Sequence, residues 1–100
     1  MSQMNYEHRK AVYAAACKKW GLAAQSVVAI EELSELAKEV CKALRGQADI
    51  NHMAEEVADV TIMLEQLRMM YDLGPAVERH MDSKIMRLVS RIAEQVGADE

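Results

Sequence analysis

Two acidic hexapeptides carry the residues of this chain that are best suited to chemistry. The sequence EELSEL occupies residues 31–36, and EEVADV occupies residues 55–60. Each contains two carboxylates three residues apart, which places both on one face of a helix. The two pairs are Glu32 with Glu35, and Glu56 with Asp59. Because carboxylate oxygens suit hard divalent cations, two such pairs facing each other predict a site for Mg²⁺, with Mn²⁺ as an alternative.

A single acidic pair of this kind is typical of a solvated helix surface. Four carboxylates beside a packed seam are different, because their mutual repulsion grows as water is excluded unless a cation lies between them. Mg²⁺ usually keeps coordination positions for water and phosphate oxygens. The double motif therefore favours a polyphosphate substrate.

The elements that must position these carboxylates are predicted to be helices. The chain has one proline and four glycines among 100 residues, and good helix formers fill most of the rest. These punctuating residues divide it into helices near residues 4–19, 23–45, 52–72 and 75–96, with Asn51 as the N-cap of the third. The run SVVAI at residues 26–30 continues into a helical pattern and is assigned to helix. We expect one all-α domain of residues 1–100, a bundle of four to five helices completed by oligomerisation.

Apolar arcs beside the carboxylates predict how the second and third helices pack. We expect these arcs to meet in an antiparallel pair, which would bring the two carboxylate pairs to face each other across the seam. The arc of the second helix comprises Leu33, Leu36, Val40 and Leu44, and that of the third comprises Val57, Val60, Leu64 and Leu67.

The order of the two motifs resembles a known family. E-x-x-E, about twenty residues, then E-x-x-D is similar to the pattern of the MazG-like, all-α nucleoside triphosphate pyrophosphatase superfamily, which includes dimeric dUTPases and phosphoribosyl-ATP pyrophosphohydrolases. Its members use four carboxylates as Mg²⁺ ligands and release a nucleoside monophosphate and pyrophosphate. The resemblance implies that Glu32, Glu35, Glu56 and Asp59 are metal ligands and catalytic residues. Glu39, on the same stripe, is a candidate further ligand or base.

Weaker similarity extends to WGLAAQ at residues 20–25 and SKIMR at residues 83–87. The superfamily often has an aromatic or amide group near the base and a lysine or arginine near the phosphates. Each candidate also fits an ordinary surface or packing role. The substrate-binding candidates are Trp20, Lys42, Lys84 and Arg87, with Arg45 as a weaker one.

Composition excludes several other classes. The net charge of −4 without a basic tract argues against nucleic acid as a partner. No apolar run approaches a membrane span or signal peptide, so we expect a soluble cytoplasmic protein in which Cys17 and Cys41 are reduced and buried. Di-iron chemistry requires Glu-x-x-His on two helices, and the nearest approach is Asp49-x-x-His52, which is predicted to lie in a loop.

The leading hypothesis is a Mg²⁺-dependent pyrophosphohydrolase of free (d)NTPs that serves nucleotide-pool housekeeping. Water would attack the α phosphorus directly and expel pyrophosphate. The alternatives are phosphoribosyl-ATP hydrolysis and a non-enzymatic helical interaction module. A homodimer or dimer of dimers is expected because the fourth helix has a long apolar stripe. The stripe comprises Val77, Met81, Ile85, Leu88, Ile92 and Val96.

Overall fold

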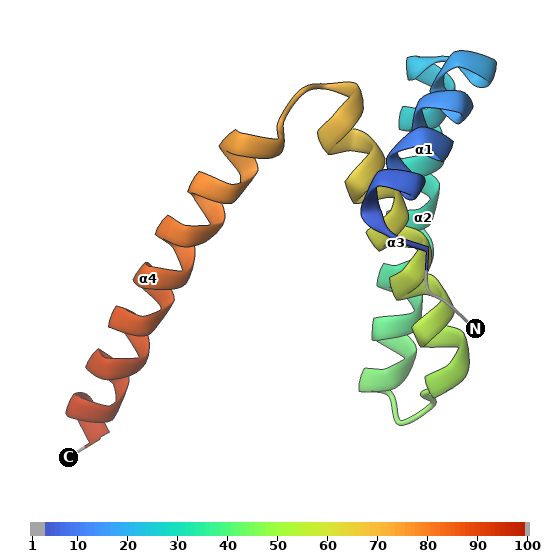
Figure 1. Cartoon of the computed structure of the whole chain (residues 1–100). Helices are drawn as coiled ribbons and strands as arrows, with labels where there is room; N and C mark the ends of the chain where they lie inside the picture. Colours follow the sequence, from blue (N-terminus) through green and yellow to red (C-terminus); the bar gives the residue numbers. More distant parts are fainter. Residues whose placement is uncertain (1–3, 100) are drawn as a thin grey trace.

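The chain folds as four helices with no strand in the part described. The computed structural model describes residues 4–99, and side chains as far as residue 94. The helices are α1 (Tyr6–Trp20), α2 (Leu22–Leu44), α3 (Ile50–Met70) and α4 (Gly74–Asp99) (Figure 1). The prediction of an all-α fold is confirmed, and residues 26–30 are helical within α2.

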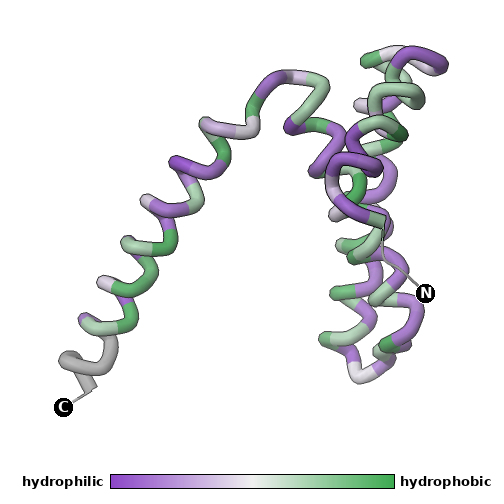
Figure 2. The backbone as a smooth tube through the Cα atoms, in the orientation of Figure 1, coloured by the Kyte–Doolittle hydropathy of each residue, from purple (hydrophilic) through white to green (hydrophobic). Residues whose placement is uncertain are grey.

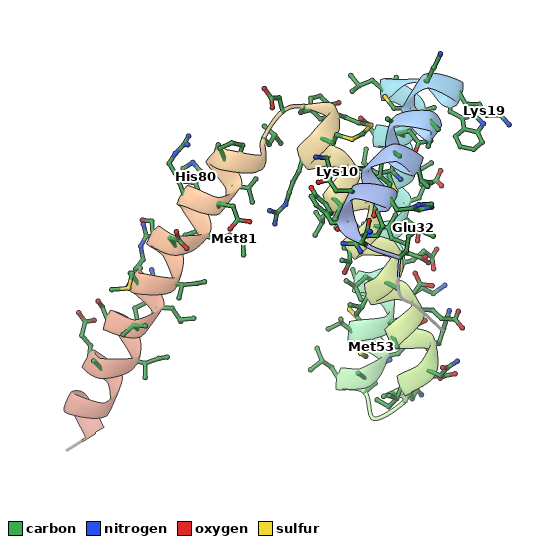
Figure 3. All side chains as sticks on the ribbon, in the orientation of Figure 1. Lys10, Lys19, Glu32, Met53, His80 and Met81 are labelled. Atoms are coloured by element: carbon green, nitrogen blue, oxygen red, sulfur yellow. The ribbon has the colours of Figure 1, made fainter. Side chains whose placement is uncertain are left out.

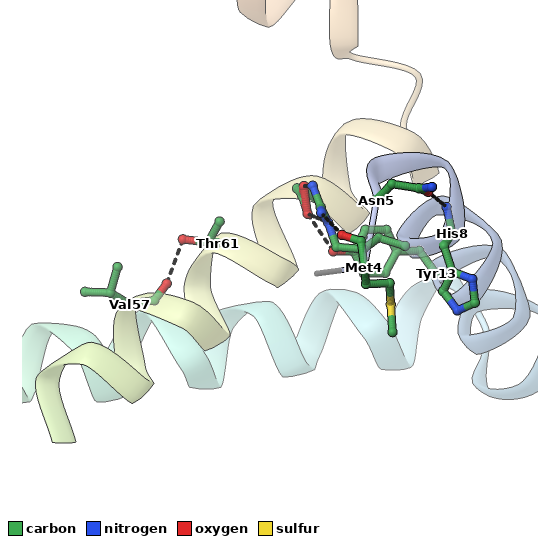
Figure 4. Close-up of polar contacts among 8 residues, drawn as sticks. Met4, Asn5, His8, Tyr13, Val57 and Thr61 are labelled. Carbon is green, nitrogen blue, oxygen red and sulfur yellow. Dashed lines mark hydrogen bonds and ion pairs between the residues drawn. The ribbon is translucent and has the colours of Figure 1, made fainter. Parts of the chain in front are cut away.

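The first turns of α1 and α3 are closed by side-chain caps. Asn5 accepts a hydrogen bond of 2.8 Å from the backbone N–H of His8 (Figure 4). Asp49 does the same for the N–H of His52 at 3.0 Å, so the prediction that Asn51 caps α3 is wrong. Both residue types cap well, and the earlier one has the extended backbone that a cap requires. The prediction that His52 lies in a loop is wrong for the same reason, because it belongs to the first turn of α3.

Glycine and proline set the connections between helices. Gly21 alone separates α1 from α2, with φ of 92°, a conformation that L side chains rarely adopt. Pro75 lies in the first turn of α4, as predicted, where its missing N–H costs no helix hydrogen bond.

The first three helices pack together, whereas α4 leaves them. α2 and α3 form an antiparallel hairpin, and α1 lies against both. α4 contacts only α3, and Figure 1 shows it extending away from the hairpin. The radius of gyration is 17.4 Å, compared with about 13 Å for a compact domain of 100 residues. The single chain therefore has too open a shape to cover its own apolar surface.

The predicted apolar arcs form only part of the seam between α2 and α3, since Val60 is buried and Leu36 and Leu67 are half-buried. Leu33, Val40 and Leu44 on α2 are exposed, and so are Val57 and Leu64 on α3. Both helices are rotated about their axes, so the neighbouring arc with its carboxylates and amides faces the partner helix. The buried residues are Tyr13, Ala29, Val60 and Met63, together with Gln25, Glu39, Glu56 and Gln66.

One apolar stripe of α4 is open to solvent. Met81, Ile85, Leu88 and Ile92 are all exposed, and the green bands in Figure 2 follow this helix away from the hairpin. The Val96 side chain belongs to this predicted stripe but lies outside the described side chains. Within the described residues, none of the helices combines the length and apolarity needed to cross a membrane.

The cysteines are less buried than expected. Cys41 is exposed and Cys17 is half-buried, so the prediction that both are small core residues is wrong for the single chain. Cys41 lies on α2 next to exposed Val40, which places it on the outer side of the hairpin.

Candidate metal centre

Three of the four predicted carboxylates converge across the α2/α3 seam. Glu32 of α2 and Glu56 and Asp59 of α3 each offer an oxygen atom, and these atoms all lie within 4.8 Å of one another. Figure 3 marks Glu32 at the middle of the hairpin. Glu56 and Asp59 share a face because they are three residues apart, and the antiparallel packing brings that face to Glu32.

The carboxylates of this cluster repel one another when they are ionised. Partial burial raises the pKa of Glu32 above its usual value, and the negative charges of Asp59 and Glu56 raise it further. The charge of Glu35 adds a smaller contribution of the same sign. A bound cation would reverse this repulsion, since it favours the ionised form of every carboxylate around it.

Glu56 has a buried carboxylate oxygen without a hydrogen-bond partner among the described residues, as Glu39 also has. Glu56 is only 8% exposed. One oxygen, Oε1, lies 3.3 Å from His52 Nε2. The other, Oε2, is buried and has no hydrogen-bond partner among the described residues. An unpaired buried carboxylate oxygen is costly, and a hard cation held by oxygen ligands would satisfy it.

Glu35, the fourth predicted ligand, stands at the edge of this arrangement. Its side chain is exposed, and it is not one of the three carboxylates whose oxygens converge. It is close enough for its charge to affect Glu32. The structure thus brings three predicted ligands together and leaves the fourth as their neighbour.

Glu39 is connected to the cluster through a histidine. It is 2% exposed. Its Oε1 lies 3.1 Å from His52 Nδ1 and 3.4 Å from Lys42 Nζ. Because the other ring nitrogen of His52 faces Glu56, the imidazole bridges the two carboxylates. Glu39 therefore supports the orientation of His52, which in turn supports Glu56.

His52 is the site residue that sequence reasoning missed. The signal was present, because His52 and Glu56 are four residues apart and so neighbours on a helix face. The error was to place His52 in a loop. The predicted helix of residues 52–72 already began at His52, and Asp49 as the N-cap places His52 within the first turn of α3.

The basic candidates divide between two regions. Lys42 reaches Glu39 and lies beside the seam. Arg45 is exposed at the C-terminal end of α2. Lys84 and Arg87 are exposed on α4, and that helix carries them away from the carboxylates of their own chain (Figure 1).

Trp20 ends α1 and borders a cavity of about 450 Å³. The indole is largely exposed, with the Lys19 ammonium 5.2 Å from the ring centroid (Lys19 is marked in Figure 3). Two amides, Gln25 and Gln66, line the same cavity.

Polar layers cross the α2/α3 seam at intervals of seven residues on each helix. Each layer is about 10 Å from the next, given the rise of a helix. The carboxylate cluster contains the middle layer, and the other two layers lie on either side of it. From the α1 end to the hairpin loop, the layers pair Gln25 with Gln66, Glu32 with Asp59, and Glu39 with His52.

A different carboxylate, Glu65, shows what a fully partnered acid looks like in this fold. Arg9 donates to both of its oxygens at 3.0 and 3.1 Å, and Tyr13 donates at 2.6 Å (Figure 4). The hydrogen bonds from Arg9 are the main reason that the pKa of Glu65 is lowered. Burial and the neighbouring carboxylate raise the pKa of Tyr13 to about 12. This group ties α1 to α3 and leaves Glu65 no free oxygen for a cation.

Comparison of the chain with protein-family models, with curated proteins and with solved structures gave no match. A function for the chain is therefore inferred from the carboxylate cluster and from the resemblance of the two acidic motifs.

Proposed function

We propose that the protein is a divalent-cation-dependent hydrolase that converts a nucleoside triphosphate into a nucleoside monophosphate and pyrophosphate. The observation that carries the proposal is the convergence of Glu32, Glu56 and Asp59, with a buried oxygen of Glu56 left unpaired. The all-carboxylate donor set fits Mg²⁺ or Mn²⁺ and disfavours softer ions. The resemblance of the double motif to the MazG-like superfamily supports the same activity, with phosphoribosyl-ATP as an alternative substrate.

The residues of the chain have distinct parts in this activity. Glu32, Glu56 and Asp59 would hold the cation, with Glu35 at their edge. A bound divalent cation would supply positive charge to the phosphates and to the departing pyrophosphate. His52 keeps Glu56 aimed into the cluster, and Glu39 holds His52 from behind. The cluster consists of carboxylates, and the proposed nucleophile is water.

An oligomer is part of the proposal. The chain exposes 7817 Å², whereas a compact monomer of 11.2 kDa is expected to expose about 5,700 Å². The excess of roughly 2,100 Å² exceeds the ~800 Å² per partner of a standard interface. The exposed stripe of α4 and the outer arc of the hairpin supply the apolar surface, so a homodimer or dimer of dimers is the proposed assembly. Lys84 and Arg87 would then serve a cluster in another copy.

The exposed face of α4 also fits the second candidate, a non-enzymatic helical interaction module. In that case the acidic residues only keep the hairpin soluble or bind a basic partner. The two functions differ in a property that is simple to measure, since a module does not need a divalent cation.

Isothermal titration with Mn²⁺ and Mg²⁺ tests the metal site directly. We expect saturable binding that is lost in the Glu56→Gln variant and kept in Glu55→Gln, whose carboxylate is exposed on the neighbouring position. No binding at millimolar cation would contradict the proposal and favour the interaction module.

Hydrolysis in ¹⁸O-labelled water tests which bond breaks. Direct attack of water on the α phosphorus places the label in the nucleoside monophosphate and leaves pyrophosphate unlabelled. Label in pyrophosphate, or orthophosphate as the first product, would contradict the proposed reaction even if the metal binds.

A further inference from the structure

The imidazole of His52 lies between two buried carboxylates, at the end of the α2/α3 seam that is nearer the hairpin loop. Its Nδ1 is 3.1 Å from Glu39 Oε1, and its Nε2 is 3.3 Å from Glu56 Oε1. Glu39 is 2% exposed and Glu56 8%, whereas the His52 side chain is 43% exposed. The imidazole therefore connects two acids inside the hairpin with the surrounding solvent.

The two ring nitrogens meet their carboxylates at different distances. The 3.1 Å contact with Glu39 lies within the usual range of an N–H···O hydrogen bond, about 2.7–3.2 Å, and the 3.3 Å contact with Glu56 lies beyond it. A neutral imidazole carries one proton, so one nitrogen is a donor and the other an acceptor. Glu39 is the nearer and the more buried acid, so the proton belongs on Nδ1. Nε2 and Glu56 Oε1 are then two acceptor atoms without a proton between them.

Two acceptor atoms at this separation suit a shared cation. Zn²⁺ binds histidine nitrogen at about 2.0–2.1 Å and carboxylate oxygen at about 2.0–2.2 Å, so adjacent ligands of a tetrahedral ion are about 3.3–3.5 Å apart. The distance of 3.3 Å between His52 Nε2 and Glu56 Oε1 falls in this range. The two residues are also four positions apart, which places both side chains on one face of α3.

The charges around this pair also favour a cation. Glu39 and Glu56 each keep a buried oxygen, Oε2, that has no hydrogen-bond partner among the described residues. Glu32 and Asp59 add negative charge from the neighbouring carboxylate cluster. Lys42 Nζ, 3.4 Å from Glu39 Oε1, offsets only part of this charge. A divalent ion beside the open ring nitrogen would stabilise the buried acids.

We propose that His52 Nε2 and Glu56 Oε1 form a second cation position beside the carboxylate cluster, which takes a borderline divalent transition ion such as Zn²⁺. Imidazole suits such ions, whereas Mg²⁺ prefers oxygen ligands. Glu39 is a positioning residue, because a carboxylate behind a ligating histidine fixes the ring and its tautomer. With two protein ligands, the ion keeps coordination positions for water or phosphate.

This second position deepens the proposed metal centre. It rests on the proposed function for the cation that shares Glu56, and not for the two ligands themselves. Oε1 of Glu56 serves the transition ion, which leaves the unpaired Oε2 for the cation of the cluster. The two positions differ in donor chemistry, since one includes an imidazole and the other only carboxylates.

A protonated imidazole is the competing explanation for the same contacts. An imidazolium donates from both nitrogens and would bridge Glu39 and Glu56 without a metal ion. It would leave Glu56 Oε2 buried and unpaired, whereas two neighbouring cations use both oxygens of that carboxylate. The two explanations differ at His52 Nε2, which carries a proton in one case and a metal ion in the other.

Nitrogen NMR of the histidine rings distinguishes a proton from a metal ion. The ¹⁵N-labelled chain is titrated with Zn²⁺ near neutral pH in phosphate-free buffer, and long-range ¹H–¹⁵N correlations report each ring nitrogen separately. We expect Zn²⁺ to shift the Nε2 resonance of His52 saturably while Nδ1 keeps its proton. His8 and His80, which are exposed, should stay near their starting values in the same range of Zn²⁺ concentration.

Substitutions separate the ligand from its support. His52→Gln should weaken Zn²⁺ binding in isothermal titration at least about tenfold, since even changes behind a metal ligand cost about 10–100-fold. Glu39→Gln should weaken it about tenfold and shift the Nδ1 resonance of His52, a change that a purely structural role would not produce. His80→Gln, which removes an exposed imidazole of α4, should bind Zn²⁺ like the parent.

Three results would overturn the second cation position. The first is an Nε2 of His52 that stays protonated in excess Zn²⁺, which identifies the imidazolium. The second is an equal shift of all three histidines, which identifies surface binding only. The third is uptake of Zn²⁺ by Cys17 or Cys41 that leaves the Nε2 resonance unchanged.

Mg²⁺ keeps this position distinct from the proposed function. If the parent binds Mg²⁺ and hydrolyses a nucleoside triphosphate while Zn²⁺ leaves His52 Nε2 unchanged, the second position fails and the hydrolase stands. If Zn²⁺ binds at Nε2 while the parent neither binds Mg²⁺ or Mn²⁺ nor hydrolyses nucleotides, the proposed function fails and the transition-ion position stands.

Discussion

The α2/α3 seam buries polar residues, whereas the stripe of α4 exposes apolar ones, which is the reverse of the usual distribution in a folded protein. Glu39, Glu56 and Gln66 are buried in the seam, whereas Leu88 and Ile92 on α4 face solvent. Each arrangement is unfavourable for an isolated chain, because buried charges need partners and large apolar stripes need cover. The seam therefore lacks partners for buried polar groups, whereas α4 lacks cover for apolar side chains.

Glu65 shows that burial of an acid does not by itself indicate a functional site. Its oxygens are fully used by Arg9 and Tyr13, and its pKa is lowered. The pKa of Glu32 is raised, because burial and like charges surround it. The two pKa values are shifted in opposite directions because hydrogen-bond donors surround Glu65, whereas other carboxylates lie close to Glu32.

The largest expected effect comes from removing a charge in the seam. Glu56→Gln should lower kcat/KM for nucleoside triphosphate at least about a hundredfold, since even changes behind a metal ligand cost 10–100-fold. In metal-free buffer the variant should be as stable as the parent or more so, because repulsion is relieved. Steady-state kinetics and thermal unfolding measure the two quantities.

Glu55→Gln is the matched control, since it removes the same charge from an exposed neighbouring position. It should change kcat/KM by less than about twofold, because exposed charges contribute little. Comparable losses in both variants would show that α3 presents a different face to the seam.

The second effect concerns the apolar stripe of α4. Leu88→Glu should weaken self-association at least about tenfold, because a charge cannot be buried in an apolar interface without a partner. Light scattering across a dilution series measures it. Ser83→Glu adds the same charge on the opposite face of α4 and should leave the assembly unchanged. A parent chain that is monomeric at micromolar concentration would refute the proposed oligomer.

Much of the fold was readable from local signals. Helix-forming residues and the placement of Gly21, Gly46 and Pro75 predicted four helices, and the structure confirms all of them with boundaries shifted by a few residues. These signals depend only on residues that are close together in the sequence, so a single sequence is enough to recognise them. The convergence of Glu32 with Glu56 and Asp59 also followed from spacing together with an antiparallel hairpin.

The rotation of α2 and α3 was not readable in the same way. The arcs with Leu33 and Val57 looked like the natural seam because they are apolar. The prediction assumed that the most apolar arc of each helix packs against the neighbouring helix of the same chain. In the structure most of these arcs, and the stripe of α4, are exposed. A sequence shows which apolar residues are favoured to be buried. It does not show whether the same chain or another chain buries them. The error over His52 was local, because it came from the choice between two capping residues, Asp49 and Asn51, two positions apart.

The third prediction tests the partnered acid, Glu65. Glu65→Gln should lower the free energy of unfolding by about 1–2 kcal/mol near neutral pH, because Arg9 loses a charged partner and Tyr13 a strong acceptor. Glu7→Gln removes an exposed ion pair with Lys10 and should cost less than about 0.5 kcal/mol. Urea unfolding measures both.

The lowered pKa of Glu65 gives this prediction a pH dependence. A lowered pKa means that the unfolded state binds the proton more readily, so the stabilisation is present above the ordinary glutamate pKa of about 4.3. It is lost as the pH falls through the lower, folded value. The stability difference between the parent and E65Q should therefore shrink below about pH 4. A difference that stays constant would show that the Arg9 contact does not depend on charge.

The smallest expected effect has the opposite sign and belongs to Glu32. Because its folded pKa is raised, the folded state binds more protons than the unfolded state between the ordinary and the raised value, and stability in EDTA should fall as the pH rises through that window. Glu32→Gln should remove this fall, whereas Glu31→Gln, at an exposed neighbouring position, should keep it. Since protons compete with the cation for Glu32, Mn²⁺ affinity should decline as the pH is lowered through the same window. Urea unfolding from pH 4 to 7, without and with Mn²⁺, measures both trends. Identical pH profiles for the parent and E32Q would show that neither burial nor the neighbouring carboxylates disfavour the charge of Glu32.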